Sequence, residues 1–266
     1  MSHLPVWLDW ARLLGPGEWS ITDQSTSLTV ESRLDRHAAA DLYARLRGVG
    51  IGGSRILLEI FPRLKRRDQR EALTAEARRM RKGSVGFAKP GTRLDEEARF
   101  SLTPEALALE VGKKASGSRV IDACAGAGGN AIGFARAGCT VTAIELDASR
   151  LEMARHNASL YGVGDRIEFI QGDARNLIRE MKADILFIDP PWGRDYNKER
   201  VALENLGPCS EILQAADHIS QRWIKTPPSF DTTILKNCTP EAVFGAADGD
   251  SRRVKFLLIR CSRSSG

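Results

Sequence analysis

The sequence lacks any long hydrophobic run. Its longest apolar stretches are about one strand in length, whereas a membrane-spanning helix needs about 20 apolar residues. The first ten residues include Asp9 and have no basic cluster ahead of a hydrophobic segment, so they do not have the pattern of a signal peptide. We therefore expect no membrane association and a cytoplasmic location.

Cysteine and histidine are also scarce. There are five cysteines, an odd and widely spaced set without a Cys-x-x-Cys pair, and only four histidines. This pattern favours neither a disulfide framework nor a zinc site, so we expect reduced cysteines and no bound metal. The cysteines are Cys124, Cys139, Cys209, Cys238 and Cys261.

The excess of positive charge is concentrated in one segment. Hydrophobic residues make up 42% of the 266 residues and charged residues 27%, as in ordinary globular proteins, and the net charge is +5. Lys65–Lys82 contains eight basic and three acidic residues, so the net charge of this segment, +5, equals that of the whole chain. Helical spacing puts Leu73, Ala77 and Met80 on an apolar stripe beside a basic arc. This arc is either a solvated helix face or a contact surface for a phosphate backbone.

The chain divides into two parts with different patterns. Residues 1–92 show helical periodicity with glycine interruptions, and we interpret them as a small, mostly helical N-terminal module, with RNA binding as one interpretation of its role. The apolar run Ile56–Phe61 is interpreted as a strand or a buried helix turn. Breaks between Gly83 and Gly91 mark the boundary to the second part, residues 93–266.

Residues 93–266 alternate short apolar strands with helices, the pattern of an α/β fold with a mostly parallel sheet covered on both faces. Helical spacing occurs over Asn130–Ala137 and Ser149–Leu160, and the turn-rich link Asp248–Asp250 favours an antiparallel C-terminal hairpin. The expected strands are Arg119–Ala123, Thr140–Glu145, Ile167–Gln171, Ala183–Asp189, His218–Lys225, Glu241–Phe244 and Val254–Ile259.

A glycine-rich loop follows the first expected strand. Arg119–Ala123 leads into Ala125–Asn130 at a strand-to-helix turn, where the backbone passes close to a ligand and a nucleotide-like cofactor is the natural occupant. The spacing also satisfies the dinucleotide fingerprint. Asp122, four residues before Gly126, separates the two cofactor classes, because a carboxylate there repels a pyrophosphate and attracts the ammonium group of S-adenosylmethionine.

Four acids come at the carboxyl ends of four successive expected strands, namely Asp122, Glu145, Asp173 and Asp189. The ends of parallel strands meet at one edge of the sheet, so these carboxylates should converge on one crevice. Such a crevice suits a cationic ligand with hydroxyl and amine donors. The alternative is that each acid merely caps the helix that follows it.

An acid, two prolines and an indole close the fourth strand, in the order Asp189, Pro190, Pro191, Trp192. Carboxylate and carbonyl oxygens there can accept the N–H groups of a base's exocyclic amine, because prolines have no N–H to pair with nearby carbonyls. An indole facing the same crevice can hold the ring by stacking, worth about 1–3 kcal/mol. We predict methylation of an amino group on a nucleobase, with Asp189, Pro190 and Trp192 as catalytic residues.

Several motifs together resemble one enzyme family. Four segments look like motifs of the trimethylguanosine synthase family, which methylates the N2 amine of guanine in cap RNA. They are Phe100–Glu105, Asp122–Asn130, Tyr161-Gly162 and Pro190–Gly193. The resemblance covers roughly residues 94–260. It implies a Rossmann-like class I methyltransferase sheet, S-adenosylmethionine as cofactor and RNA as partner.

The resemblance also implies roles for individual residues. Asp122 and Gly126 would hold the methionine end of the cofactor, Glu145 the ribose and Asp173 the adenine amine, while Trp192 would stack on guanine. The predicted cofactor-binding residues are Phe100, Ser101, Thr103, Asp122, Ala123, Gly126, Gly128, Asn130, Glu145, Leu146, Asp173, Ala174 and Asp189. The predicted substrate-binding residues are Pro191, Trp192, Arg194, Tyr196 and Lys225, the last as a partner of a phosphate.

Three other functions stay open at this level. Adenine N6 is an alternative target, because Asp-Pro-Pro-Trp is common among adenine methyltransferases. The glycine loop alone would fit an NAD-type oxidoreductase, although no catalytic histidine or Tyr-x-x-x-Lys pair accompanies it. A non-catalytic RNA-binding module with the same fold is the third alternative, because a fold does not establish an activity.

Overall fold

The computed structural model describes residues 7–24, 27–193, 196–234 and 236–262. Arg194, one of the predicted substrate-binding residues, lies outside these ranges. Along the part of the chain that is described, no helix is long and apolar enough to cross a membrane.

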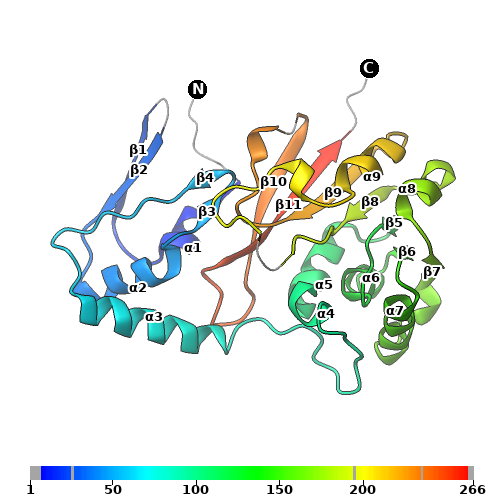
Figure 1. The fold of residues 1–266 in the computed structure, drawn as a ribbon, viewed down its shortest axis with the longest axis horizontal. Coiled ribbons are helices and arrows are strands. Elements are labelled where there is room, and N and C mark those ends of the chain that lie inside the picture. The colour runs from blue at the N-terminus through cyan, green and yellow to red at the C-terminus, as the bar shows by residue number, and fades with distance from the viewer. Residues whose placement is uncertain (1–6, 25–26, 194–195, 235, 263–266) are drawn as a thin grey trace.

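A seven-stranded sheet forms the centre of the molecule (Figure 1), with the strand order β10-β11-β9-β8-β5-β6-β7. β9, β8, β5, β6 and β7 are parallel, and β11 runs antiparallel to both β9 and β10. The mostly parallel sheet and its antiparallel C-terminal hairpin are therefore confirmed. The strands are β5 (Arg119–Asp122), β6 (Thr140–Glu145), β7 (Ile167–Gln171), β8 (Ile185–Ile188), β9 (Gln221–Thr226), β10 (Cys238–Phe244) and β11 (Val254–Ser262).

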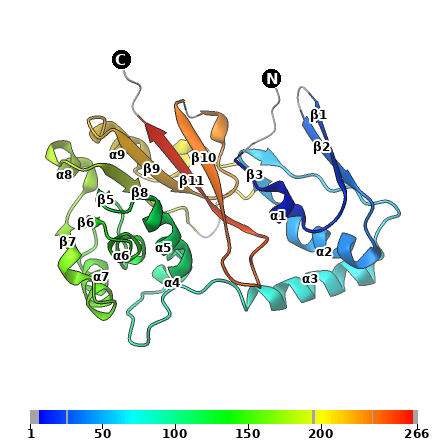
Figure 2. The ribbon, with the colours of Figure 1, turned by 180° about the vertical axis from the view of Figure 1, so that it is seen from behind.

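Helices cover both faces of this sheet (Figure 1 and Figure 2). Alternate side chains of the strands point to opposite faces. Val120 and Phe187 belong to a buried cluster with α5, α6 and α7, while Ile121 and Leu186 belong to a cluster with α8 and α9. The helices are α4 (Ala98–Ser101), α5 (Glu105–Lys114), α6 (Gly129–Arg136), α7 (Ala148–Leu160), α8 (Ala174–Leu177) and α9 (Cys209–Ala215). Short 3-10 helices occupy Gly164–Arg166, Ile178–Glu180, Leu203–Asn205 and Thr232–Ile234.

The N-terminal part contains two small hairpins as well as helices. Its elements are α1 (Trp10–Leu14), β1 (Trp19–Gln24), β2 (Ser27–Ser32), α2 (Arg36–Leu46), β3 (Gly50–Ile51), β4 (Ser54–Arg55) and α3 (Arg66–Met80). The helices agree with the sequence pattern, but the hairpins were not predicted. A third buried cluster joins Leu13 and Leu46 to Phe244 of β10, so this part packs directly on the C-terminal hairpin of the sheet.

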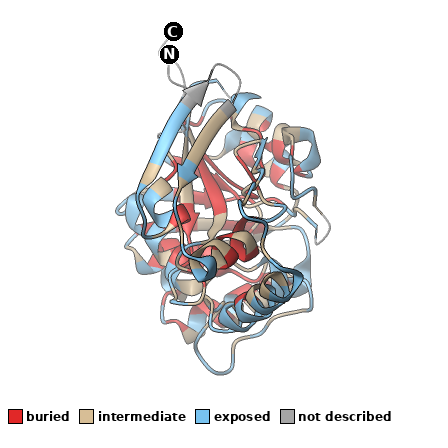
Figure 3. Ribbon diagram, turned by 90° about the vertical axis from the view of Figure 1, so that its left-hand side faces the viewer, coloured by how far each residue is buried: buried red, intermediate tan, exposed pale blue. Residues whose placement is uncertain are grey.

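The run Ile56–Phe61 forms neither a strand nor a helix, so that prediction was wrong. Leu57 and Phe61 are 77% and 86% exposed, the highest values among the large hydrophobic side chains that the structure describes. A short apolar run does not reveal whether a partner surface exists to cover it. Figure 3, in which the N-terminal part faces the viewer, shows the buried strands behind this exposed outer layer.

α3 packs through polar residues, and the predicted apolar stripe does not form its buried face. Leu73 is 38% exposed and Ala77 is exposed, whereas Glu76 is buried. The Glu76 carboxylate accepts from Arg79 of the same helix at 2.6 Å and from Arg253 beside the C-terminal hairpin at 2.5 Å. Two guanidinium partners allow this carboxylate to be buried, which hydrophobic periodicity cannot indicate.

A disulfide joins Cys238 of β10 to Cys261 of β11. The expectation of reduced cysteines was therefore wrong for this pair. The two residues lie directly opposite each other in the antiparallel register, with Cα atoms 4.0 Å apart. Their pairing depends on strand register, which their separation in the sequence does not give. Cys124, Cys139 and Cys209 are free.

Candidate active site

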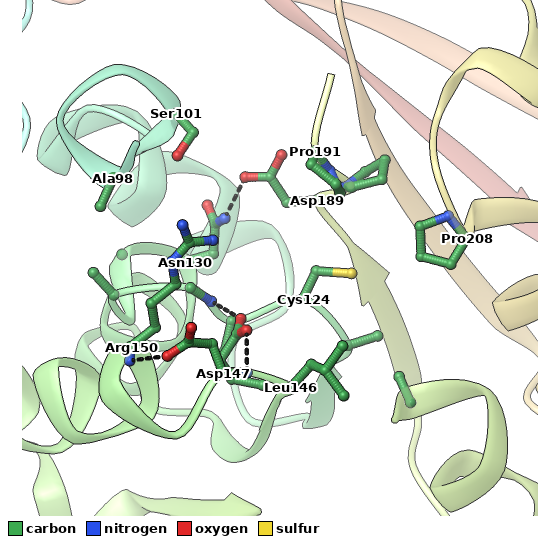
Figure 4. Close-up of a pocket in the computed structure, with 18 of the residues that line it drawn as sticks. Ala98, Ser101, Cys124, Asn130, Leu146, Asp147, Arg150, Asp189, Pro191 and Pro208 are labelled. Carbon is green, nitrogen blue, oxygen red and sulfur yellow. Dashed lines mark hydrogen bonds between the residues drawn. The ribbon is translucent and has the colours of Figure 1, made fainter. Parts of the chain in front are cut away.

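A cavity of about 580 Å³ lies at the carboxyl ends of β5, β6, β7 and β8 (Figure 4). The segment after each of these strands contributes to its wall, and three of the four predicted acids, Glu145, Asp173 and Asp189, line it. The remaining wall comes from α4 and the residues after it, from α7 and from α9. In the part of the chain that is described, no group of three or more histidine, cysteine, aspartate or glutamate side chains could hold a metal ion.

The glycine loop after β5 brings backbone to the edge of the cavity. Gly126 has φ +53° and Gly128 has φ +91°, a region that side chains rarely permit. A Cβ atom on Gly128 would lie 3.0 Å from Ala154 of α7, so the loop also needs glycine for close packing. The amide of Gly126 donates to Glu145 Oε2 at 2.8 Å, and the amide of Asp147 donates to Glu145 Oε1 at 3.0 Å. Glu145 therefore ties the β5 loop to the end of β6.

Asp122 lies at the end of β5 with its side chain fully buried, and it is not part of the cavity wall. Neither carboxylate oxygen has a hydrogen-bond partner among the described residues. Burial, together with the negative charge of Asp189, raises the pKa of the Asp122 carboxyl to about 8. The amides of Cys124 and Ala131 lie near without normal hydrogen-bond geometry and oppose this shift only in part. Asp122 is thus an unpaired buried acid behind the cavity.

Asp189 is held by a network of donors. Its Oδ2 atom accepts three hydrogen bonds. The donors are Asn130 Nδ2 at 2.8 Å, Lys225 Nζ at 2.7 Å and Thr103 Oγ1 at 3.5 Å. Figure 4 shows Asp189 between Asn130 and Pro191. All three donors reach the same oxygen, and none of the described residues donates to Oδ1. Asp189 therefore keeps one carboxylate oxygen for a ligand.

Lys225 was predicted to meet a substrate phosphate, but it is buried below this network instead. Its side chain is 5% exposed, and its ammonium group forms the ion pair with Asp189. The same ammonium lies 5.0 Å from the centroid of Trp192 and 5.4 Å from that of Phe256. A buried lysine needs such partners, because an uncompensated charge is costly to bury.

Trp192 was expected to face the cavity, and the structure places it beside the cavity instead. The indole is half-buried against the clusters on both faces of the sheet, and its Nε1 is buried with no hydrogen-bond partner among the described residues. Its ring centroid is 6.1 Å from that of Tyr196, in an edge-to-face arrangement. Contacts with Lys225 and Tyr196 hold the ring in this position, outside the cavity wall.

Most of the predicted cofactor-binding residues do line the cavity. The lining residues that the sequence predicted are Ser101, Thr103, Ala123, Gly126, Asn130, Glu145, Leu146, Asp173, Ala174, Asp189, Pro190 and Pro191. The described residues that were predicted and do not line it are Phe100, Asp122, Gly128, Trp192, Tyr196 and Lys225. For Asp173 the capping alternative also holds, because it accepts from the amide of Arg175 at the start of α8 and pairs with the Arg175 side chain.

Arg150 is the clearest residue that sequence reasoning missed. It rises from α7 into the cavity wall and pairs with Asp95 at 2.7 Å and Glu97 at 2.5 Å. Hydrogen bonding to Glu97 is the main cause that raises the pKa of its guanidinium above the ordinary value. Its only signal in the sequence is its place one turn into the helix after Glu145. The other lining residues outside the predicted set are Glu97, Ala98, Leu102, Cys124, Ala125, Ala127, Gly129, Asp147, Gly172, Arg175, Pro208 and Ile212.

Comparison with known protein families identifies the segment that builds this site. Residues 117–226 match the family model described as RNA cap guanine-N2 methyltransferase. This segment is similar to that family. The match confirms the resemblance inferred from the motifs, and with it the methyltransferase class whose cofactor is S-adenosylmethionine.

Individual relatives agree with this assignment. The trimethylguanosine synthase of Schizosaccharomyces pombe is 36% identical over 113 residues, which are 39% of this chain and 47% of that protein. Ribosomal RNA small subunit methyltransferase J of Hydrogenovibrio crunogenus is 31% identical over 168 residues, 55% of this chain and 60% of that protein. The chain thus matches less than two thirds of the length of either relative.

The fold has a counterpart among solved structures. A putative methyltransferase from Porphyromonas gingivalis W83 superimposes with a TM-score of 0.52 and 21% sequence identity, over 86% of this chain and 58% of that one. This similarity confirms the Rossmann-like methyltransferase fold.

Proposed function

We propose that the protein transfers a methyl group from S-adenosylmethionine to the exocyclic N2 amine of a guanine in RNA. One observation carries the proposal: in the segment that matches the guanine-N2 family model, an acid-rich cavity opens beside Asp189 and the two prolines that follow it. The match favours this reading over the oxidoreductase alternative, which shares only the glycine loop.

The charge of the cavity supports a cationic cofactor. Five carboxylates and two guanidinium groups line it, and the buried Asp122 lies behind it. A sulfonium and an ammonium group are attracted by this surplus of acids, whereas a pyrophosphate is repelled. Glu145 and Asp173 would hold the ribose and the adenine amine, and the open space at Gly126 gives a ligand access to the backbone.

The residues around Asp189 account for the transfer step. S-adenosylmethionine supplies a methyl group that is already activated, so the protein chiefly positions the acceptor amine. The free Oδ1 of Asp189 and the carbonyl of Pro190 accept the N–H groups of the amine. Asn130 and Lys225 fix the Asp189 carboxylate through its other oxygen. This arrangement would orient the nitrogen towards the methyl donor, and the Asp189 carboxylate would take up the proton that the amine loses when the methyl group leaves the sulfonium.

Labelled S-adenosylmethionine tests the activity directly. The protein is incubated with fractionated cellular RNA, DNA and protein, and the pool that takes up label is digested to its components. We expect the label in RNA, as N2-methylated guanosine. Label in N6-methyladenosine would establish the adenine alternative, and absence of transfer to every pool would favour a binding module.

Asp189→Asn tests the assigned residue. The amide keeps an acceptor for Lys225 but has neither the charge nor the second carboxylate oxygen, so we expect methyl transfer to fall at least 100-fold while the cofactor dissociation constant changes little. Asp184→Asn is the matched control, because Asp184 precedes the opposite end of β8 and pairs with Arg119 on the surface. Equal loss of cofactor binding and transfer in Asp189→Asn would contradict the role.

A further inference from the structure

The exposed side of α3 presents unpaired positive charge. The acids of this helix are all neutralised, since Asp68 pairs with Arg36, Glu71 with Arg67, and Glu76 with Arg79 and Arg253. Five exposed arginines in the same region have no carboxylate partner among the described residues. We call them the basic ridge: Arg63, Arg66, Arg70, Arg78 and Arg81.

Four arginines of the ridge lie along one side of α3, in two pairs separated by about two turns. Arg66, Arg70, Arg78 and Arg81 are four, eight and three residues apart, spacings that keep side chains on one side of a helix. With a rise of 1.5 Å per residue, the row extends about 22 Å from Arg66 to Arg81. A row of guanidinium groups of this length suits several consecutive phosphates of a nucleic-acid strand.

A hollow with an aromatic rim adjoins the start of the ridge. It has a volume of about 560 Å³ and lies where α2, the segment before α3 and the first turn of α3 meet. Phe61, Tyr43, Arg63 and Arg66 are in its wall, together with the acid Glu59. Phe61 is 86% exposed, so its ring is available to a planar partner.

The ridge has a fixed position on the catalytic part. Glu76 on the buried side of α3 pairs with Arg253, and Asp250 in the β10–β11 turn accepts from the amide and hydroxyl of Ser84 just after the helix. A Cβ atom on Gly249 would lie 2.2 Å from the carbonyl oxygen of Arg79, so the turn packs directly on the helix backbone. α3 therefore lies beyond the β10–β11 edge of the sheet (Figure 1), away from the cavity at β5 to β8.

We propose that the basic ridge and the Phe61 hollow bind a single-stranded segment of the substrate RNA. Arginines contact its phosphates and Phe61 stacks on a base, so that one RNA spans both the ridge and the methylation site. This inference rests on the proposed function. A membrane surface fits less well, because α3 itself exposes only Leu73 as a large apolar side chain and the exposed Leu57 and Phe61 lie before the helix, so the helix has no apolar face opposite its arginines.

Fluorescence anisotropy tests the ridge. It measures the binding of a fluorescein-labelled single-stranded RNA of about 12 nucleotides to the full chain. The variant is Arg66→Gln/Arg70→Gln/Arg81→Gln. We expect its affinity to fall at least tenfold at about 100 mM salt. The slope of log affinity against log salt should become shallower by about 2, because about 0.7 counterions are released per phosphate contact.

A charge-matched variant controls for net charge. Lys113→Gln/Arg179→Gln/Lys182→Gln removes three exposed charges outside the ridge and the cavity, and we expect its affinity to stay within twofold of the unmodified protein. Equal weakening by both triple variants, or wild-type affinity in the ridge variant, would overturn the proposal.

Phe61→Ala tests the stacking contact. Loss of one stacked base corresponds to about 1–3 kcal/mol, so we expect affinity to fall about 5- to 150-fold with an unchanged salt slope. Phe61→Trp should retain binding. Wild-type affinity in Phe61→Ala would overturn the stacking assignment.

Vesicles that contain phosphatidylserine test the membrane alternative. If the ridge variant loses binding to these vesicles and keeps its RNA binding, the ridge is a membrane contact and the proposal is overturned.

Methyl transfer separates this inference from the proposed function. The ridge variant should methylate a guanine-containing trinucleotide as the unmodified protein does and lose efficiency only on long RNA. If the unmodified protein transfers no methyl group to any RNA, the proposed function fails, and the binding measurements still decide whether the ridge holds RNA.

Discussion

Asp122→Asn probes the unpaired acid behind the cavity. The folded protein raises the pKa of this carboxyl from 3.8 to about 8, chiefly through burial and then through Asp189. Asparagine has nearly the same shape and cannot ionise. The variant therefore removes one titration from the folded state and leaves the packing at the end of β5 almost unchanged.

The pKa values fix the sign of the effect. Between pH 3.8 and about pH 8 the folded state retains a proton on Asp122 that the unfolded chain has released. The free energy of unfolding of the unmodified protein therefore falls as pH rises through this window, and the contribution is fully present only below it. A shift of about 4 pH units corresponds to about 6 kcal/mol, an upper value because dipoles and water relax around a new charge.

The difference in the free energy of unfolding between the two proteins is measured by urea unfolding from about pH 5 to about pH 8, with tryptophan fluorescence as the signal. Titrations of the other groups cancel between the two proteins, so the variant should gain several kcal/mol of stability relative to the unmodified protein across the window. Asp184→Asn should show no such slope, because hydrogen bonds from Arg119 hold the pKa of Asp184 below its ordinary value. A constant difference between Asp122→Asn and the unmodified protein would refute the reasoning.

The same carboxyl should couple cofactor binding to protons. A cation bound in the cavity stabilises the ionised form of Asp122 and lowers its pKa, so binding near pH 7 should release a proton. Calorimetry in two buffers of different ionisation enthalpy measures this release, and Asp122→Asn should abolish it.

Three further predictions concern packing and cross-links. Lys225→Met should lower stability by about 3–5 kcal/mol in urea, because it leaves the Asp189 carboxylate without its cation, and adding Asp189→Asn should recover most of the loss. Gly133→Ala should lower stability by about 1–3 kcal/mol in thermal unfolding, because the new Cβ would lie 2.5 Å from the carbonyl oxygen of Ala108 and force α5 and α6 apart. Dithiothreitol should lower stability by about 3 kcal/mol, since the β10–β11 disulfide closes a loop over a separation of 23 residues, whereas Cys238→Ala should not respond to it.

The sequence determined the class of fold and the edge of the sheet that carries the site. Strand and helix periods are local, so β6 and β7 have the predicted bounds. Parallel strands end at one edge, so acids following successive strands had to converge there. The glycine loop could be predicted for the same reason, because its positive φ angles are a property of the loop itself.

Only the tertiary structure decided which of these side chains meet. Lys225 follows Asp189 by 36 residues, and β8 and β9 lie side by side in the sheet, which brings its ammonium to the acid and not to a phosphate. Trp192 packed beside the cavity, Arg150 entered its wall, and the disulfide formed across an antiparallel register. Each of these outcomes depends on contacts between segments that are distant in the sequence. Local periodicity does not indicate which distant residues will pack against a given side chain or pair with its charge.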